Sequence, residues 1–172
     1  ENDVRPMGRT ARGVRGMNLS DGQEVIAMLV APAEVAEGAV AAVEDAAAPN
    51  SVLTATENGY GKRTPIAEYT RHGRGTKGMI AIQTSERNGK VVAAALVSPE
   101  DQIMLITTGG VLVRTRVSEI REMGRATQGV TLINVDEGTH LSGLQRIAES
   151  DSDEDGDDVG DEQSNGKNKP WL

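Results

Sequence analysis

The sequence contains no cysteine and no phenylalanine, and its only aromatic residues are Tyr60, Tyr69 and Trp171. Without cysteine the chain cannot form a disulfide, a Cys-based zinc site or a thiol nucleophile. No apolar run approaches the roughly 18 consecutive residues that a membrane helix needs, and no basic-then-apolar segment opens the chain. The composition therefore excludes a disulfide scaffold and gives no sign of export or membrane insertion.

The net charge of −8 is distributed unevenly along the 172 residues. Residues 149–172 carry nine acids and two lysines, which predicts a disordered acidic tail. Residues 32–50 carry four acids, no base and eight alanines, which predicts an Ala/Glu-rich inserted linker. The remaining residues, 1–31 and 51–148, carry 16 basic and 13 acidic side chains, so the folded part is predicted to be mildly basic.

An internal repeat organises this folded part. A shift of 51 residues superimposes 53–82 on 104–133 with ten identities, and a shift of 116 lays 1–17 on 117–133 with six. The repeat predicts a first unit at 1–31 that is the C-terminal half of a blade, a second unit at 51–99 that is a complete blade, and a third unit at 100–148 that is the last complete blade. In this phase the chain begins within a repeat, which is typical of a fragment of a longer array.

Turn signals divide the units into short strands. Asn58-Gly59, Asn88-Gly89 and Gly109-Gly110 separate β-rich segments of four to seven residues, and no helix-period pattern competes with them. Four antiparallel strands in each unit of about 50 residues predict an all-β, propeller-like array of about two and a half blades. A β-sandwich is the alternative fold.

A polar motif recurs in each unit where two strands are joined. It reads GRTARGV at 8–14, GRGTKGM at 73–79 and GRATQGV at 124–130, and we refer to these segments as motif loops 1, 2 and 3. Glycines five residues apart predict a tight loop, and an arginine in every copy places a planar cation beside its backbone amides. Three copies on one edge of successive blades would form a cationic stripe, which suits a polyanion.

Further basic residues lie close to the motif loops, whereas aromatic residues that could stack on single-stranded bases are scarce. Contact with the backbone of duplex DNA is therefore predicted. The predicted DNA contacts are Arg9, Arg12, Arg15, Lys62, Arg63, Arg71, Arg74, Lys77, Arg114, Arg116, Arg121, Arg125 and Gln128. The alternative is that the arginines form ion pairs between blades with Asp3, Glu68, Glu119 and Glu122.

Other motif matches do not predict a site. Residues 73–78 fit G-x-G-x-x-G but join two strands and do not open a helix, so no nucleotide site is predicted. Residues 151–162 fit a calcium-loop pattern, but no helices are predicted to flank them, so no metal site is expected. No nucleophile is placed beside His72 or His140, so we predict no catalytic residue and no cofactor in this chain.

Four segments together closely resemble the C-terminal domain of DNA gyrase A subunits. They are NGYGKRTPIAEY at 58–69, GRGTKG at 73–78, IMLIT at 103–107 and motif loop 3. In that family the domain is a six-bladed β-pinwheel whose basic rim wraps duplex DNA. The family's signature box, Gln-Arg-Arg-Gly-Gly-Lys-Gly, has its nearest relative here in HGRGTKG at 72–78.

The resemblance implies a DNA-wrapping fragment that supports ATP-dependent negative supercoiling by an A2B2 holoenzyme with the gyrase B subunit. The parent protein would be a type II topoisomerase in the bacterial cytoplasm, associated with the chromosome. ATP and Mg²⁺ would be handled outside this fragment, and the acidic tail would modulate wrapping. The alternatives are the equivalent domain of topoisomerase IV and a propeller-type protein-interaction module.

Overall fold

The structure, a computed structural model, describes residues 4–31 and 50–147. Its strands are β1 (Ser51–Thr56), β2 (Tyr60–Pro65), β3 (Val91–Val97), β4 (Gln102–Thr107), β5 (Leu112–Arg116), β6 (Val130–Thr131) and β7 (Leu141–Ile147). Two 3-10 turns follow β2 and β5, namely η1 (Ile66–Glu68) and η2 (Val117–Glu119). Within these ranges there is no α-helix, and none of the helical segments could cross a membrane. The predicted linker, apart from Asn50, and the predicted tail lie outside the described residues.

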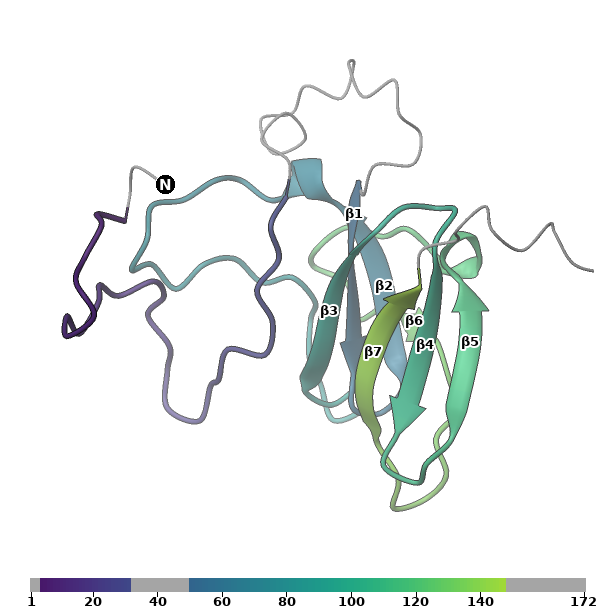
Figure 1. The fold of residues 1–172 in the computed structure, drawn as a ribbon. Helices are drawn as coiled ribbons and strands as arrows, with labels where there is room; N and C mark the ends of the chain where they lie inside the picture. Colours follow the sequence, from purple (N-terminus) through teal and green to yellow (C-terminus); the bar gives the residue numbers. More distant parts are fainter. Residues whose placement is uncertain (1–3, 32–49, 148–172) are drawn as a thin grey trace, which may run out of the picture.

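The strands form two antiparallel sheets, which confirms the predicted all-β array of blades (Figure 1). The first sheet has the order β3-β1-β2-β6 and the second the order β5-β4-β7. Strands β1, β2 and β3 correspond to β4, β5 and β7 under the repeat. The correspondence extends to an irregularity in register, which falls between Ala55 and Thr56 in one sheet and between Ile106 and Thr107 in the other.

Glycines with positive φ close the two equivalent hairpins. Between β1 and β2 the amide of Gly59 donates to the Thr56 carbonyl at 2.9 Å, and Gly59 has φ of 80°. Between β4 and β5 the amide of Gly110 donates to the Thr107 carbonyl at 3.1 Å, with φ of 81°. A residue with a side chain adopts this conformation only at a cost, so the predicted turn glycines set both hairpins.

The core lies between the two sheets, where β3 packs against β7. In β4 the burial alternates with period two, so that Ile103 and Leu105 are buried and their neighbours are half-buried. The rest of the fully buried cluster is Leu53, Ala55 and Val97 of the first sheet, Leu141 of the second, and Val117 of η2. Each fully buried aliphatic side chain contributes about 1.5–3 kcal/mol. The core is thus built from aliphatic residues.

The fourth strand of the first sheet comes from the third unit, whereas the sequence predicted all four strands of a blade within one unit. Tyr60 and Gly61 of β2 pair with Thr131 and Val130 of β6. Two glycines make this approach possible: a Cβ on Gly129 would lie 2.6 Å from the Gly61 carbonyl oxygen, and a Cβ on Gly61 would overlap the Thr54 carbonyl oxygen. The second and third units are therefore joined by a strand that the third adds to the sheet of the second, as well as by packing.

The first unit makes a similar contact with motif loop 2. The amide of Gly75 donates to the Gly16 carbonyl at 2.7 Å, and the amide of Asn18 donates to the Thr76 carbonyl at 2.9 Å. Met17 and Thr76 form an isolated parallel bridge, and Met17 holds the one bridge within residues 4–31. Motif loops 2 and 3, whose preceding units lie in the described residues, thus each dock on the unit before them.

The close approach at Gly129 generates a stability prediction. Gly129→Ala places a methyl group against Gly61 and also forces alanine to positive φ, whereas Gly78→Ala, at the same motif position, meets only Met17 Cε at 3.6 Å. We expect Gly78→Ala to lower the free energy of unfolding by about 1–3 kcal/mol through φ strain. Gly129→Ala should cost at least about 1 kcal/mol more because the backbones must separate.

Chemical denaturation of the two variants and the wild-type chain measures this difference. Equal losses for the two variants would contradict the close inter-unit approach at Gly129.

Candidate nucleic-acid interface

The three motif loops share one backbone geometry. The last glycine of each has positive φ, 80° at Gly13, 74° at Gly78 and 81° at Gly129. Each loop also closes on its first glycine through a donor three residues later: the amide of Ala11 in loop 1 at 3.0 Å, and the hydroxyls of Thr76 and Thr127 in loops 2 and 3 at 3.3 and 2.9 Å. The predicted tight loop is therefore present in every copy.

Side chains of β2 hold motif loop 3 and the residue before it. The Thr64 hydroxyl donates to the Met123 carbonyl at 2.8 Å. The Lys62 ammonium donates to the carbonyl of Gly124 and, at 2.7 Å, to that of Arg125. Lys62 and Thr64 are two residues apart and so share one face of the strand. Three consecutive carbonyls of the third unit are thus fixed by the second unit.

Lys62 therefore has a structural role in place of the predicted DNA contact. Its side chain is 0 % exposed, so the ammonium cannot reach a phosphate from outside. Burial lowers the pKa of Lys62, the nearby Glu68 carboxylate opposes this shift, and the Arg125 guanidinium adds to it. The sequence predicted an exposed side chain because lysine is almost never fully buried. Burial is possible here because the two carbonyls accept hydrogen bonds from the ammonium.

Arg63 is also directed into the molecule. Its Nε donates to the Ile120 carbonyl at 2.8 Å, and its NH1 lies 4.0 Å from a Glu122 carboxylate oxygen. The side chain is only 17 % exposed. For this arginine the geometry matches the alternative of ion pairing between units, and it offers little surface to DNA.

Arg125 and Gln128 of motif loop 3 are half-buried between units. The Arg125 amide donates to Oε2 of Glu68 at 3.1 Å, and its guanidinium NH1 donates to the Ile80 carbonyl at 3.4 Å. The Gln128 carbonyl accepts a hydrogen bond from Asn88 at 3.1 Å. Arg125 thereby links motif loop 3 to the residue that follows motif loop 2.

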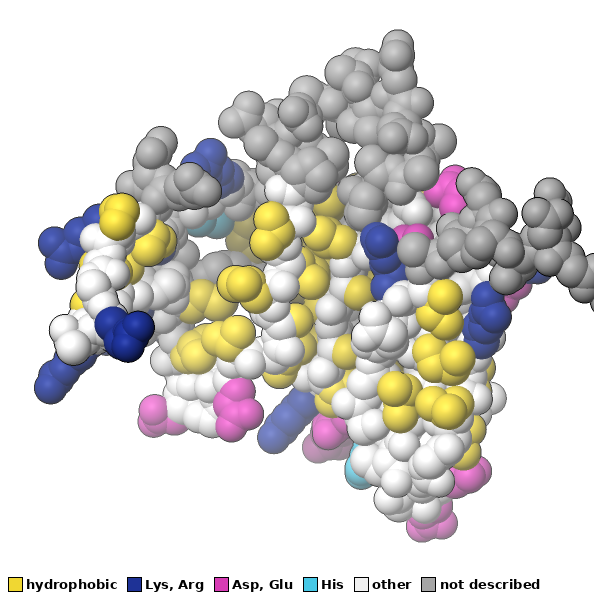
Figure 2. Space-filling model, viewed as in Figure 1, with side chains coloured by type: hydrophobic (Ala, Val, Ile, Leu, Met, Phe, Trp, Pro, Cys, Tyr) yellow, Lys and Arg dark blue, Asp and Glu magenta, His cyan; other side chains and the backbone are white. Residues whose placement is uncertain are grey.

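The other nine predicted contacts are exposed cations. They are Arg9, Arg12, Arg15, Arg71, Arg74, Lys77, Arg114, Arg116 and Arg121. Arg114 and Arg116 alternate along β5, which is an edge strand of its sheet in the described residues, and Arg114 Nε donates to Gln102 at 2.6 Å. Figure 2 shows Lys and Arg side chains around the outer N-terminal segment, at the left of the view, and over the β4–β5 region.

Two residues that hold motif loop 3 were not predicted for this role. Asn88 is 0 % exposed and donates to the carbonyls of Gln83 at 2.9 Å and Gln128. The sequence indicated only a turn at Asn88-Gly89. Glu68 was considered only as a partner for arginine side chains, whereas it accepts from a backbone amide. The repeat aligns Glu68 with an identical residue, Glu119, and this was the one sequence feature that could have indicated a structural role for it.

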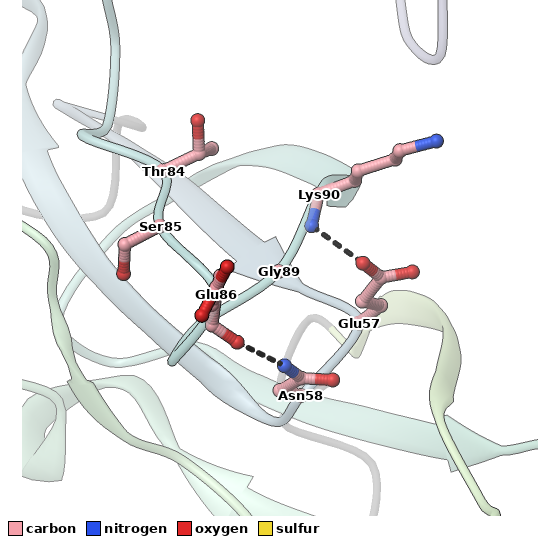
Figure 3. A pocket seen from close by; sticks show the side chains of 7 residues that line it. All are labelled: Glu57, Asn58, Thr84, Ser85, Glu86, Gly89 and Lys90. Atoms are coloured by element: carbon pink, nitrogen blue, oxygen red, sulfur yellow. Dashed lines mark hydrogen bonds between the residues drawn. The ribbon is translucent and has the colours of Figure 1, made fainter.

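A cavity of about 300 Å³ lies at the turns between β1 and β2 and before β3 (Figure 3). Oε1 of Glu57 accepts from the Lys90 amide at 2.8 Å, and Asn58 donates to the Glu86 carbonyl at 3.2 Å. Two carboxylates beside one lysine make this an unfavourable place for a phosphate. In the described part of the chain no group of three His, Cys, Asp or Glu residues is placed to hold a metal ion.

Comparisons with known proteins agree with this geometry. The sequence model of the family described as "DNA gyrase C-terminal domain, beta-propeller" matches residues 1–32, 50–98 and 101–148. The chain is 50 % identical over 159 residues to the DNA gyrase A subunit of Neisseria gonorrhoeae and 47 % identical to that of Escherichia coli strain K12, covering 92 % of this chain in each case. It spans 16 % of the length of these two relatives.

Two solved structures share the architecture. A structure of the DNA gyrase A C-terminal domain superimposes with a TM-score of 0.70 and 27 % identity, covering 86 % of this chain and 45 % of that one. A crystal structure of the C-terminal domain of DNA topoisomerase IV superimposes with a TM-score of 0.71 at 20 % identity, a likeness of fold alone, covering 85 % and 41 %. With its sequence model matched across all three units, the chain belongs to the DNA gyrase C-terminal domain family of β-propellers.

Proposed function

We propose that this chain is a DNA-binding and DNA-wrapping part of a gyrase A subunit. The parent protein is then a type II topoisomerase that works with the gyrase B subunit and the remainder of its own chain in negative supercoiling, with ATP and Mg²⁺ bound outside this fragment. The setting that follows from this function is the bacterial cytoplasm, at the chromosome. The support is membership of the family, the identity to gyrase A subunits and the arrangement of the motif loops.

The observation that carries the proposal is the serial docking of the motif loops. Loop 2 docks on residues 16–18 of the first unit, and loop 3 docks on β2 of the second unit. Exposed cations accompany loops 1 and 2, and others lie on or just after β5 of the third unit. Cations repeated along a row of units can contact a polyanion at several points along its length, which a single pocket cannot do.

The tyrosines favour duplex DNA over single strands. The Arg87 guanidinium lies over the Tyr60 ring, 4.7 Å from its centroid, so this face is not open to a base. Tyr69 is half-buried after η1, with its hydroxyl buried. Single-strand binding by stacking requires open aromatic faces. Contact with phosphates of a duplex is the better fit.

Among the alternatives, gyrase fits better than topoisomerase IV because curated relatives with identities near one half are gyrase A subunits. A protein-interaction module would share the propeller fold. It would have no need for an arginine in each motif loop, and its binding would not depend on DNA length.

Salt dependence of DNA affinity tests the proposal. With about six phosphate contacts, the slope of log affinity against log salt concentration should be near −5. Lys77 is exposed in motif loop 2, whereas Lys90 is exposed in the same unit but lies just before β3. Replacing Lys77 by Met should make the slope shallower by about 0.9, because one phosphate contact is lost.

Lys90→Met is the matched control, since it removes the same charge outside the motif loops, and its slope should equal that of the wild-type chain. Equal slopes for all three proteins would contradict DNA contact by motif loop 2.

The acidic residues 149–172 provide a second test. β7 ends at Ile147, which pairs with Gln102, and Gln102 also pairs with Arg116 of β5. Ile147 thus lies about two strand spacings, or roughly 10 Å, from Arg116, an exposed cation of the proposed surface. The segment 149–172, with a net charge of −7, follows Ile147 in the sequence. A chain ending at residue 148 should bind duplex DNA more tightly than the full chain at low salt, and the difference should shrink as salt is added. Equal affinities at low salt would show that this segment does not compete with DNA.

A further inference from the structure

We propose that Lys62 and Glu68 are positioning residues, which fix the backbone around Arg125 so that motif loop 3 meets DNA in one orientation. This inference rests on the proposed function. Lys62 and Glu68 can position motif loop 3 without contacting DNA themselves. The evidence is the set of side-chain contacts that the second unit makes with the backbone of the third.

Lys62 and Thr64 turn three peptide groups in one direction. The carbonyls of Met123, Gly124 and Arg125 all accept hydrogen bonds from these two side chains. In a trans peptide the N–H points away from the carbonyl. The amides of Gly124, Arg125 and Ala126 are therefore directed away from the donors on β2. Consecutive amides that face the same way suit an anion, and here the Glu68 carboxylate binds the middle one, that of Arg125.

Glu68 fixes the same segment from the other direction. Its Oε2 accepts the Arg125 amide at 3.1 Å, and both carboxylate oxygens lie within 3.8 Å of the place where a Cβ on Gly124 would stand. The carboxylate also favours the charged form of Lys62, which burial disfavours. Loss of Glu68 would thus release the amide and weaken the Lys62 contacts together.

The position of Glu68 is set by the fold. It is the last residue of η1, and η1 follows directly from β2, which carries Lys62 and Thr64. One continuous stretch of seven residues, 62–68, therefore supplies both the donors and the acceptor. The repeat places Glu119 at the same point of η2 in the third unit, next to β5, which has no further strand beside it in the described residues. Glu119 is for that reason a matched control.

The first experiment compares duplex affinity and its salt slope for the full chain and the variants Lys62→Met and Lys77→Met. Both variants remove one positive charge. We expect Lys62→Met to weaken affinity about tenfold with the slope unchanged, because orientation is lost but no phosphate contact is. A slope made shallower as much as in Lys77→Met would show that Lys62 contacts phosphate directly. An unchanged affinity would show that Lys62 serves stability alone. Either result would overturn the inference.

The second experiment uses the exposed Glu68, and its outcome decides the question if Lys62→Met fails to fold. By charge alone, Glu68→Ala should bind DNA more tightly, because a repelling carboxylate is removed. Positioning predicts the opposite sign, a weaker affinity, while Glu119→Ala binds as tightly as the wild-type chain or more tightly. Tighter or unchanged binding by Glu68→Ala would overturn the inference.

Hydrogen exchange separates this inference from the proposed function. In the absence of DNA, the amides of residues 123–126 should exchange faster in Glu68→Ala than in the wild-type and Glu119→Ala chains. Unchanged exchange would overturn the positioning role even if DNA binding were established. A wild-type chain without salt-dependent DNA binding would contradict the proposed function. Faster exchange at 123–126 in Glu68→Ala would then still show that Glu68 fixes the backbone of motif loop 3.

Discussion

The docking of a motif loop on the unit before it is the contact on which the rest of the structure depends. At the one junction where both partners are complete, β6 adds to β2, and the Gly61 and Gly129 backbones approach too closely for any side chain. Three carbonyls of the third unit are bound by Lys62 and Thr64 at the same junction. The first sheet is completed only through this contact, so the blade and the loop that follows it are one structural element.

This constraint divides the basic residues into two groups with different physical roles. Lys62 and Arg63 point inward, where they satisfy carbonyls or face an acid of the next unit. The cations of loops 1 and 2 and of β5 are exposed, so solvent reaches their side chains. The same residue type therefore serves assembly in one place and, in our proposal, phosphate contact in another. A modest excess of basic over acidic residues in the folded part is enough for both roles, because their positions are fixed by the array.

Much of this arrangement was predictable from the sequence. Hairpin glycines such as Gly59 and Gly110, the β-rich segment that forms β4 and the repeated motif loops all depend on local rules, and each is found as expected. The addition of β6 to the sheet of the second unit was not predictable, because a repeat shows which segments are equivalent but not which unit they pair with. Lys62 was misassigned because its burial depends on carbonyls about 60 residues away. Residues 4–31 hold only the bridge at Met17, since a strand needs a neighbour and the equivalents of β1 and β2 do not occur in that segment.

The central claim is that the docked motif loops form one DNA-binding surface, and hydrogen–deuterium exchange of the full chain with and without duplex DNA at low salt tests it most directly. The account predicts slower exchange on DNA addition in all three motif loops, 8–14, 73–79 and 124–130. It predicts no change at the turn segment 84–90, most of which lines the cavity beside Glu57. Slower exchange confined to that turn segment, or to a single motif loop, would contradict a continuous surface along the array.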